Sequence, residues 1–446
     1  MTAFSLVWAG QLVSMFGSAM TQFALTLFVY QETQAATALA LMGVFTFLPL
    51  VLASPVAGAL VDRWNRKLVM MLSDLASGAA SIAILVLSSL GSLEVWHLYV
   101  TGFIIGTFQA FQFPAYSAAI STMVPKDHYG RAAGMMSLAG SASGIAAPVL
   151  AAGVLALGGL NAVLLIDVAS FLVAIAALAV VRVPQPPVSA EGARARGSLW
   201  SESVFGFRYI LERPPLLALQ LVFLCINLTA TFGFTVMAAM VLSRTGQDSL
   251  QFGAVQSAAG LGGVLGAVLL TAWGGPRRKV YGVLGGMAAA GLLGLLPLGT
   301  GRVLPVWMFG AFANALIVPV LNGCNQAIWQ AKVPPDIQGK VFSARRMIAW
   351  LANPLAMLLA GPAADLLFTP ALMPGGSLAS SLGPLVGVGA GAGMGLMLAL
   401  AGLAQGAVAL TAWLSPTVRE ADRLVPDHDA ALPPAPAGTG AVAAAS

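Results

Sequence analysis

Two acidic residues, Asp74 and Asp167, stand inside long apolar stretches of this chain. A charged carboxylate is costly in hydrocarbon, so burial favours the protonated form and makes proton uptake near neutral pH possible. Asp167 lies about 10 Å from the nearer end of its stretch, counted at the rise of a helix. We predict that Asp167, or else Asp74, couples the protein to protons. The alternative is that each carboxylate only bonds neighbouring backbone or hydroxyl groups.

Side-chain amides are concentrated in every third apolar stretch. The first, fourth, seventh and tenth stretches hold eleven Asn and Gln residues, whereas the other eight hold three away from their ends. Spacings of three or four residues place the polar side chains of each stretch on one helical face. The four faces are predicted to line one central cavity that binds substrate. Hydrogen bonding between tightly packed helices is the alternative. The predicted substrate residues are Gln11, Ser18, Gln22, Gln109, Gln112, Tyr116, Asn227, Thr231, Asn322, Asn325 and Gln326.

The distribution of charged and metal-binding residues limits the chemistry further. Lys and Arg are not expected deep in any stretch, and an anionic substrate would need such a cation, so an apolar, neutral or cationic substrate is predicted. A further carboxylate, Asp365, stands near the end of the eleventh stretch. The three His residues are scattered, and the two Cys residues are far apart, so we expect no metal site, no cofactor and no disulfide. An enzyme would need a cluster of catalytic groups, which this pattern does not suggest.

The elements that must hold these residues are helices that cross a membrane. Hydrophobic residues make up 58% of the chain, charged residues 8%, and the mean hydropathy is +0.88. Each apolar stretch is long enough to cross about 30 Å of hydrocarbon. The sequence predicts an all-α polytopic membrane protein of twelve transmembrane helices. They span residues 4–30, 37–60, 68–91, 97–122, 132–155, 160–181, 215–241, 251–273, 279–299, 303–331, 341–367 and 385–414.

Basic residues indicate the orientation of these helices. If the first helix runs outward, all of the 21 Lys and Arg residues except Arg244 and Arg302 fall in cytoplasmic loops or at their edges. Cytoplasmic loops of membrane proteins carry this excess, so both termini are predicted to be cytoplasmic. The formal charge of +5 therefore reflects dispersed loop residues, and no nucleic-acid partner is expected.

The chain divides into two halves of six helices each. We predict a first bundle over 1–181, a cytoplasmic linker over 182–214 with a short interfacial helix over 199–211, a second bundle over 215–414 and a disordered tail over 415–446. The segment Val124–Arg131 recurs as Val333–Lys340, which indicates two diverged copies in the same orientation. Parallel repeats of this kind are typical of transporters, whose substrate path lies between the halves.

The loop between the second and third helices carries a recognisable motif. Gly58-Ala-Leu-Val-Asp62-Arg63-Trp-Asn-Arg66-Lys67 resembles the signature loop of the major facilitator superfamily, which often has Gly in place of Asn65. The resemblance implies a gating loop of Gly58, Asp62, Arg63, Arg66 and Lys67. Gly58 permits close helix approach, and Asp62 can pair with a cation or cap a helix start, which would latch the cytoplasmic side in one state.

Further segments resemble the macrolide-efflux and enterobactin-exporter branch of that superfamily, among them Gln11-Leu-Val-Ser14 and Phe113-Pro-Ala115. In that branch an acidic residue often follows the Gly of helix 1, whereas here Ser18 follows Gly17. The fifth helix carries Gly144, Pro148 and Gly153, which is similar to the antiporter motif of the superfamily.

The resemblance implies an exporter in the bacterial inner membrane. It would expel an amphipathic antibiotic, siderophore or peptide-like metabolite by proton-coupled alternating access. The expected partners are a small-molecule substrate, protons and the lipid bilayer, with a monomeric protein. A lysophospholipid flippase or an importer of the same fold remains an alternative, as does a non-transporting sensor or scaffold.

Overall fold

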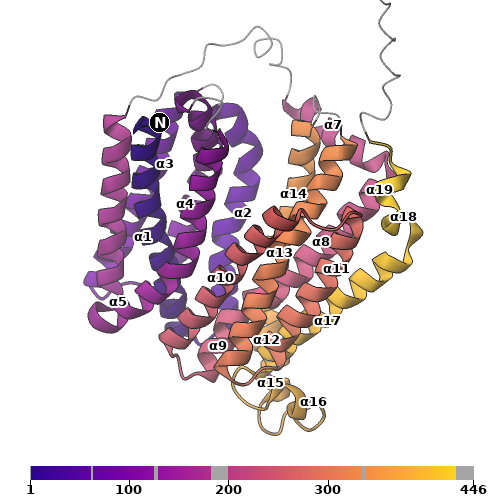
Figure 1. The fold of residues 1–446 in the computed structure, drawn as a ribbon. Coiled ribbons are helices and arrows are strands. Elements are labelled where there is room, and N and C mark those ends of the chain that lie inside the picture. Colours follow the sequence, from indigo (N-terminus) through magenta and orange to yellow (C-terminus); the bar gives the residue numbers. More distant parts are fainter. Residues whose placement is uncertain (1, 62–63, 125–128, 182–198, 334–337, 428–446) are drawn as a thin grey trace, which may run out of the picture.

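A computed structural model describes residues 2–61, 64–124, 129–181, 199–333 and 338–427, and every regular element within these ranges is helical (Figure 1). A chain in lipid must satisfy its backbone hydrogen bonds internally, and a helix does so within one segment. Ten helical segments of the described residues are long and apolar enough to cross a membrane. The chain is therefore a multi-pass, all-helical membrane protein, while the count of twelve spans stays a prediction.

The first half begins with α1 and ends with α5, an element that contains a break. Gly159 in α5 has φ 66° and ψ −170°, which is not helical, so two helical arms meet at this residue. The break falls between the predicted fifth and sixth helices, at a residue type that adopts positive φ without strain. The elements are α1 Thr2–Thr33, α2 Ala36–Val61, α3 Arg66–Ser89, α4 Val95–Met123 and α5 Tyr129–Val180.

The second half follows a short helix over 199–211, where the sequence predicted one. Several of its long segments change helical type along their length, and two turns are π-helical. The elements are α7 Leu199–Leu211, α8 Pro214–Thr235, α9 Met237–Arg244, α10 Ser249–Trp273, α11 Lys279–Ala289, η2 Ala290–Leu295, α12 Leu296–Thr300, α13 Leu304–Lys332, α14 Gln338–Ala363, η3 Ala364–Phe368 and α15 Thr369–Leu372. The last ones are α16 Ala379–Val386, α17 Ala392–Leu414, α18 Pro416–Arg419 and α19 Ala421–Leu424.

The last predicted span, 385–414, differs from the structure at its start. The chain leaves α16 at Val386, and α17 begins only at Ala392. Gly387, Gly389 and Gly391 all have positive φ, a conformation that ends a right-handed helix. The apolar pattern continues through these glycines, which is why sequence reasoning placed the start of the helix too early.

The C-terminal segment is ordered further than the sequence predicted. Residues 416–424 form α18 and α19, although disorder was expected from residue 415. Arg278 forms ion pairs with Glu420 at 3.0 Å and Asp422 at 3.2 Å. Lys332 pairs with Asp427 at 2.6 Å. Acidic tail residues thus find basic partners on the second bundle, and residues 428–446 lie outside the described residues.

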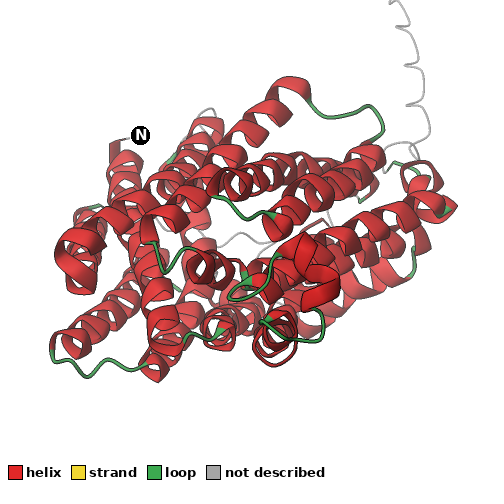
Figure 2. Ribbon diagram, turned by 90° about the horizontal axis from the view of Figure 1, so that it is seen from below, coloured by secondary structure: helices red, strands yellow, loops and turns green. Residues whose placement is uncertain are grey.

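The two halves meet at one end of the molecule. We call it the α16 end, and the opposite end, near α7, the α7 end (Figure 1). One hydrophobic cluster joins both halves, with Phe23 of α1 stacked on Phe252 of α10 at 5.1 Å between ring centroids. The other buried clusters of the described residues each belong to one half. The halves diverge toward the α7 end (Figure 1). The view from below shows helices joined by loops, with no strand among the described residues (Figure 2).

Candidate functional site

A cavity of about 380 Å³, lined by amide, hydroxyl and carboxyl side chains together with apolar ones, lies within the first half. It is enclosed by α1, α2, α3, α4 and the second arm of α5, and both intramembrane acids, Asp74 and Asp167, line it. One face of α1 contributes Gln11, Ser14, Ser18 and Gln22, at the spacing of successive helical turns.

Asp74 on α3 connects three helices through its carboxylate. Its side chain is buried, with 5% of the residue exposed. The amide of Gln11 donates to Oδ2 at 2.9 Å, and the amide of Gln112 donates to Oδ1 at 2.9 Å. The Gln112 amide also lies 3.4 Å from the Gln11 carbonyl oxygen. Amide side chains on α1 and α4 therefore hold this carboxylate, a contact that the sequence did not predict.

Asp167 in the second arm of α5 is held by hydroxyl groups. Only 1% of the residue is exposed. Ser81 of α3 donates to Oδ2 at 2.8 Å, and Ser18 of α1 donates to Oδ1 at 3.3 Å. A Cβ atom on Gly17 would lie 2.9 Å from Asp167 Oδ1 and 3.0 Å from its Cα. Glycine at position 17 is thus what lets α1 approach closely enough to place Ser18 on the carboxylate.

These surroundings suit a carboxyl group that changes its protonation state. A serine hydroxyl can donate to a carboxylate and can also accept from a protonated carboxyl, so Asp167 keeps its partners in both states. Within the described part of the chain, neither Asp74 nor Asp167 forms an ion pair. Ser73 Oγ and Gln112 Oε1 are buried and make no hydrogen bond with the described residues.

Three cavity residues on α3 escaped the sequence reasoning. Ser73, Ser77 and Ser81 line the cavity at intervals of four residues, beside Asp74. That interval places them on one helical face and was visible in the sequence. Attention to amides alone passed over these hydroxyls, because serine is common in membrane helices as a small packing residue.

The predicted substrate residues divide between this cavity and other places. Those in the cavity are Gln11, Ser18, Gln22, Gln109 and Gln112, and those outside it are Tyr116, Asn227, Thr231, Asn322, Asn325 and Gln326. Thr231 donates to Asn353 at 3.0 Å, and Asn325 is buried. All residues that line the cavity around the carboxylates belong to the first half. A substrate role for the second-half residues stays a prediction.

Arg345 is a cation that the sequence reasoning assigned to a loop edge. It lies in α14, within the candidate span Ala344–Leu372. Its guanidinium donates to Gln326 Oε1 at 3.0 Å and lies 5.3 Å from the ring centroid of Trp329. Arg345 is the second residue of that span, so it lies at the edge of the membrane helix, where the sequence placed it.

The predicted gating loop is described only in part. Asp62 and Arg63 lie outside the described residues, Gly58 lies in the last turn of α2, and Arg66 begins α3. Lys67 donates to the backbone oxygens of residues 179 and 181 at 2.9 and 2.8 Å, which caps the end of α5 with a cation. Asn65, where the superfamily often has Gly, accepts from the backbone N–H of residue 68 and caps the start of α3.

Two of the three predicted antiporter-motif residues lie against α10 of the other half. A Cβ on Gly260 would lie 3.0 Å from the oxygen of Gly144, and one on Gly253 would lie 3.2 Å from the oxygen of Pro148. Ser257 donates to the oxygen of residue 145 at 2.6 Å. The third residue, Gly153, has no atom within 4 Å of where its Cβ would be. The α5–α10 contact therefore depends on small residues from both halves.

A sequence profile of the Major Facilitator Superfamily matches residues 7–357. The chain belongs to the Major Facilitator Superfamily. Macrolide efflux protein A of Streptococcus pyogenes is 28% identical over 375 residues, which cover 81% of this chain and 89% of that protein. The multidrug efflux pump Tap of Mycolicibacterium fortuitum is 28% identical over 373 residues, which cover 78% and 86% of the two chains.

Solved structures support the fold. The crystal structure of a bacterial homologue of the human lysosomal transporter Spinster, inward-facing and unoccupied, aligns with a TM-score of 0.64 at 15% identity. The alignment covers 95% of this chain and 98% of that one. A point mutant of the nucleoside transporter NupG aligns with a TM-score of 0.68 at 11% identity, covering 92% and 99%. The chain is thus a multi-pass transporter of this superfamily.

Proposed function

We propose that this transporter exports amphipathic small molecules across the bacterial cytoplasmic membrane in exchange for protons. The observation that carries the proposal is a cavity of mixed polar and apolar lining in which two carboxylates, Asp74 and Asp167, have amide and hydroxyl partners instead of cations. The relatives named for macrolide and multidrug efflux support the outward direction. Ten helical segments qualify as membrane spans. Dividing the span Ala142–Val180 at its break, Gly159, adds one, and counting α4 as a further span brings the number to twelve.

The positive-inside rule places the α7 end in the cytoplasm. The two basic residues expected on the other side, Arg244 and Arg302, bind backbone oxygens near the α16 end. With that orientation, the halves are closed on the outer side and diverge on the inner side. The structure then corresponds to an inward-facing state, in which the cavity receives substrate from the cytoplasm or the inner leaflet.

Charge selects the substrate and couples it to protons. A carboxylate without a cationic partner attracts a protonated amine, whereas a protonated carboxyl does not. A cationic substrate and a proton can therefore compete for Asp167, and this competition is the requirement for antiport. Ser18 occupies the position on helix 1 where the resembling exporters often carry an acid. The carboxyl group of Asp167 lies beside it. A neutral amphipathic compound could use the amides and serines of the same cavity.

The first experiment measures accumulation of macrolides and cationic dyes in pump-deficient bacteria. Cells express the wild type, Asp167→Asn or Asp74→Asn at matched membrane levels, with and without an uncoupler. Asparagine keeps the shape of both side chains and removes the titratable proton, so a folded variant isolates coupling. We expect wild-type cells to accumulate less compound, and uncoupler or Asp167→Asn to abolish the difference.

Other outcomes of this assay redirect or contradict the proposal. If uncoupler abolishes export but Asp167→Asn does not, the effect of Asp74→Asn decides whether coupling belongs to Asp74. Export that persists with uncoupler in all variants would contradict proton coupling. If expression changes the accumulation of no compound, the export proposal fails, and import or lipid transfer becomes the next function to test.

A further inference from the structure

The closed α16 end contains a charged contact between the halves that the proposed coupling does not use. Asp365 of the second half accepts hydrogen bonds from the backbone N–H groups of Ala36, at 3.0 Å, and Thr37, at 2.8 Å. These two residues begin α2 in the first half. A carboxylate from one half therefore caps a helix of the other.

The start of α2 depends on this carboxylate. The first N–H groups of a helix have no partner within it, and the N-terminus carries a partial positive charge. The preceding residue, Ala35, donates instead to Thr33 Oγ1 of its own half at 3.3 Å. Ala36 is fully buried, so water does not reach it in this conformation. The cap of the next two N–H groups thus comes from Asp365.

The backbone around Asp365 is shaped for this contact. Asp365 lies in the five-residue π-helical segment η3, Ala364–Phe368, which follows α14. Wider turns of this kind redirect side chains and are frequent at functional sites. One turn earlier, a Cβ on Gly361 would lie 2.6 Å from the Cα of Thr37, so glycine lets α14 approach the start of α2.

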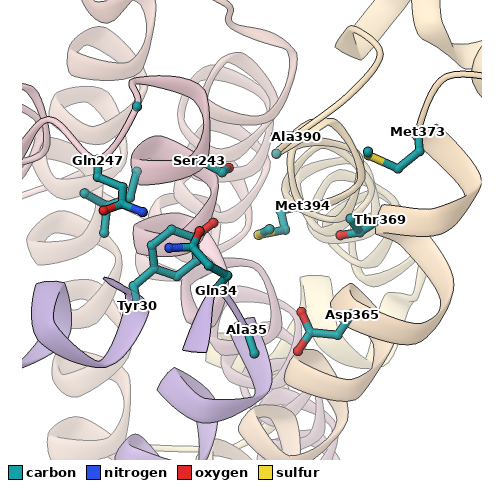
Figure 3. A pocket seen from close by; sticks show the side chains of 13 residues that line it. Tyr30, Gln34, Ala35, Ser243, Gln247, Asp365, Thr369, Met373, Ala390 and Met394 are labelled. Carbon is teal, nitrogen blue, oxygen red and sulfur yellow. The ribbon is translucent and has the colours of Figure 1, made fainter. Parts of the chain in front are cut away.

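A cavity of about 550 Å³ reaches the carboxylate from the α16 end. Figure 3 shows Asp365 facing this space below Thr369, with Tyr30, Gln34 and Ser243 on the other side. If the halves separated here, water would have a direct path to both the carboxylate and the exposed N–H groups. The contact can therefore break and re-form without leaving a dry, unpaired charge.

We infer that Asp365 is an outer latch, which holds the α16 end closed and must release α2 whenever that end opens. The inference rests on the proposed function for the assignment of this end to the outside. It also complements the sequence motif, because Asp62 near the end of α2 was expected to latch the cytoplasmic side.

The test measures how far the α16 end opens. Spin labels are attached to Ser92→Cys and Ser377→Cys, exposed positions on the two halves, in a Cys225→Ser background because Cys225 is exposed. Pulsed electron paramagnetic resonance in lipid nanodiscs then gives the distance distribution without substrate or proton gradient. We expect Asp365→Ala to raise the ratio of open to closed populations by about fivefold or more, since charge-assisted hydrogen bonds are lost.

A matched control is available on the same side of the molecule. Asp248 caps α10 by accepting from the backbone N–H groups of Leu250 and Gln251, all within one half. Asp248→Ala removes a helix cap of the same kind without touching the interface, so its distance distribution should match the wild type. Asp365→Asn, which keeps one acceptor oxygen, should lie between Asp365→Ala and the wild type, and it replaces Asp365→Ala if that variant does not fold.

An unchanged distribution in the folded Asp365 variants would overturn the latch, and so would an equal shift in Asp248→Ala. The result is independent of the export assay, because it needs no transported compound. A protein that fails to export any tested compound can still show the shift, and an exporter can fail to show it.

Discussion

Replacing Gly266 by Ala should destabilise the protein, whereas replacing Gly263 should not. Both glycines lie in α10, three residues apart. A Cβ on Gly266 would lie 2.9 Å from the carbonyl carbon of Leu316 and 3.1 Å from its Cα, in the backbone of α13. A Cβ on Gly263 would meet nothing within 4 Å. The two substitutions are the same chemically and differ only in what surrounds them.

The magnitude follows from two opposing terms. Alanine favours a helix over glycine by about 1 kcal/mol, and this gain applies at both positions. Carbon atoms in contact prefer about 3.5–4.0 Å, so Ala at position 266 must push α13 away. Overpacking of this kind costs about 1–3 kcal/mol. Because the helix term cancels between the variants, Gly263→Ala should be more stable than Gly266→Ala by about 1–3 kcal/mol.

Thermal unfolding in detergent, followed by the loss of the monodisperse peak on size exclusion, checks this difference. About 1 kcal/mol corresponds to about 2–4 °C in a unit of about 200 residues, so the two midpoints should differ by about 2–12 °C. Gly263→Ala should equal or exceed the wild type. Equal midpoints for both variants, or a lower one for Gly263→Ala, would refute the reasoning that α10 and α13 touch through Gly266.

Two further predictions concern the contact between the halves and the docked tail. Gly260→Val should weaken the α5–α10 contact, since even a Cβ there would lie 2.7 Å from Ile145 Cγ1. It should raise the open population seen by spin labels at Ser92→Cys and Ser377→Cys, whereas Gly263→Val should not. Partial burial opposes ionisation of Glu420, but Arg278 outweighs it and holds the pKa of Glu420 below its usual range. The stability that this pair contributes is present above the unfolded pKa of about 4.3 and is lost as pH falls through the folded pKa. Limited proteolysis should therefore cut the tail faster in acid. Arg278→Gln should remove most of that pH dependence.

The helices themselves were predictable from the sequence. Spans long enough to cross a membrane must be helical, because lipid offers no hydrogen bonds to the backbone. Local sequence also indicated an interruption between residues 155 and 160, where the structure has a break at Gly159, and a short helix over 199–211. Where apolar residues continued through a backbone break, as at Gly387–Gly391, composition misplaced the start of the helix.

Helical spacing also determined which residues share a face, but not which helix that face would meet. The polar faces of α1 and α4 were visible in the sequence, yet only tertiary structure brought Gln11 and Gln112 onto Asp74 of α3. The separation of the halves left the second-half amides outside that cavity.

The contact of Asp365 with the start of α2 joins groups more than 300 residues apart in the chain. The local pattern places a carboxylate near a helix end and leaves two N–H groups free at another. Their pairing depends on how the two halves pack, which is set by close approach at glycines such as Gly361 and by apolar contact at one end. Local periodicity carries no information about such a distance, so only the tertiary structure decided it.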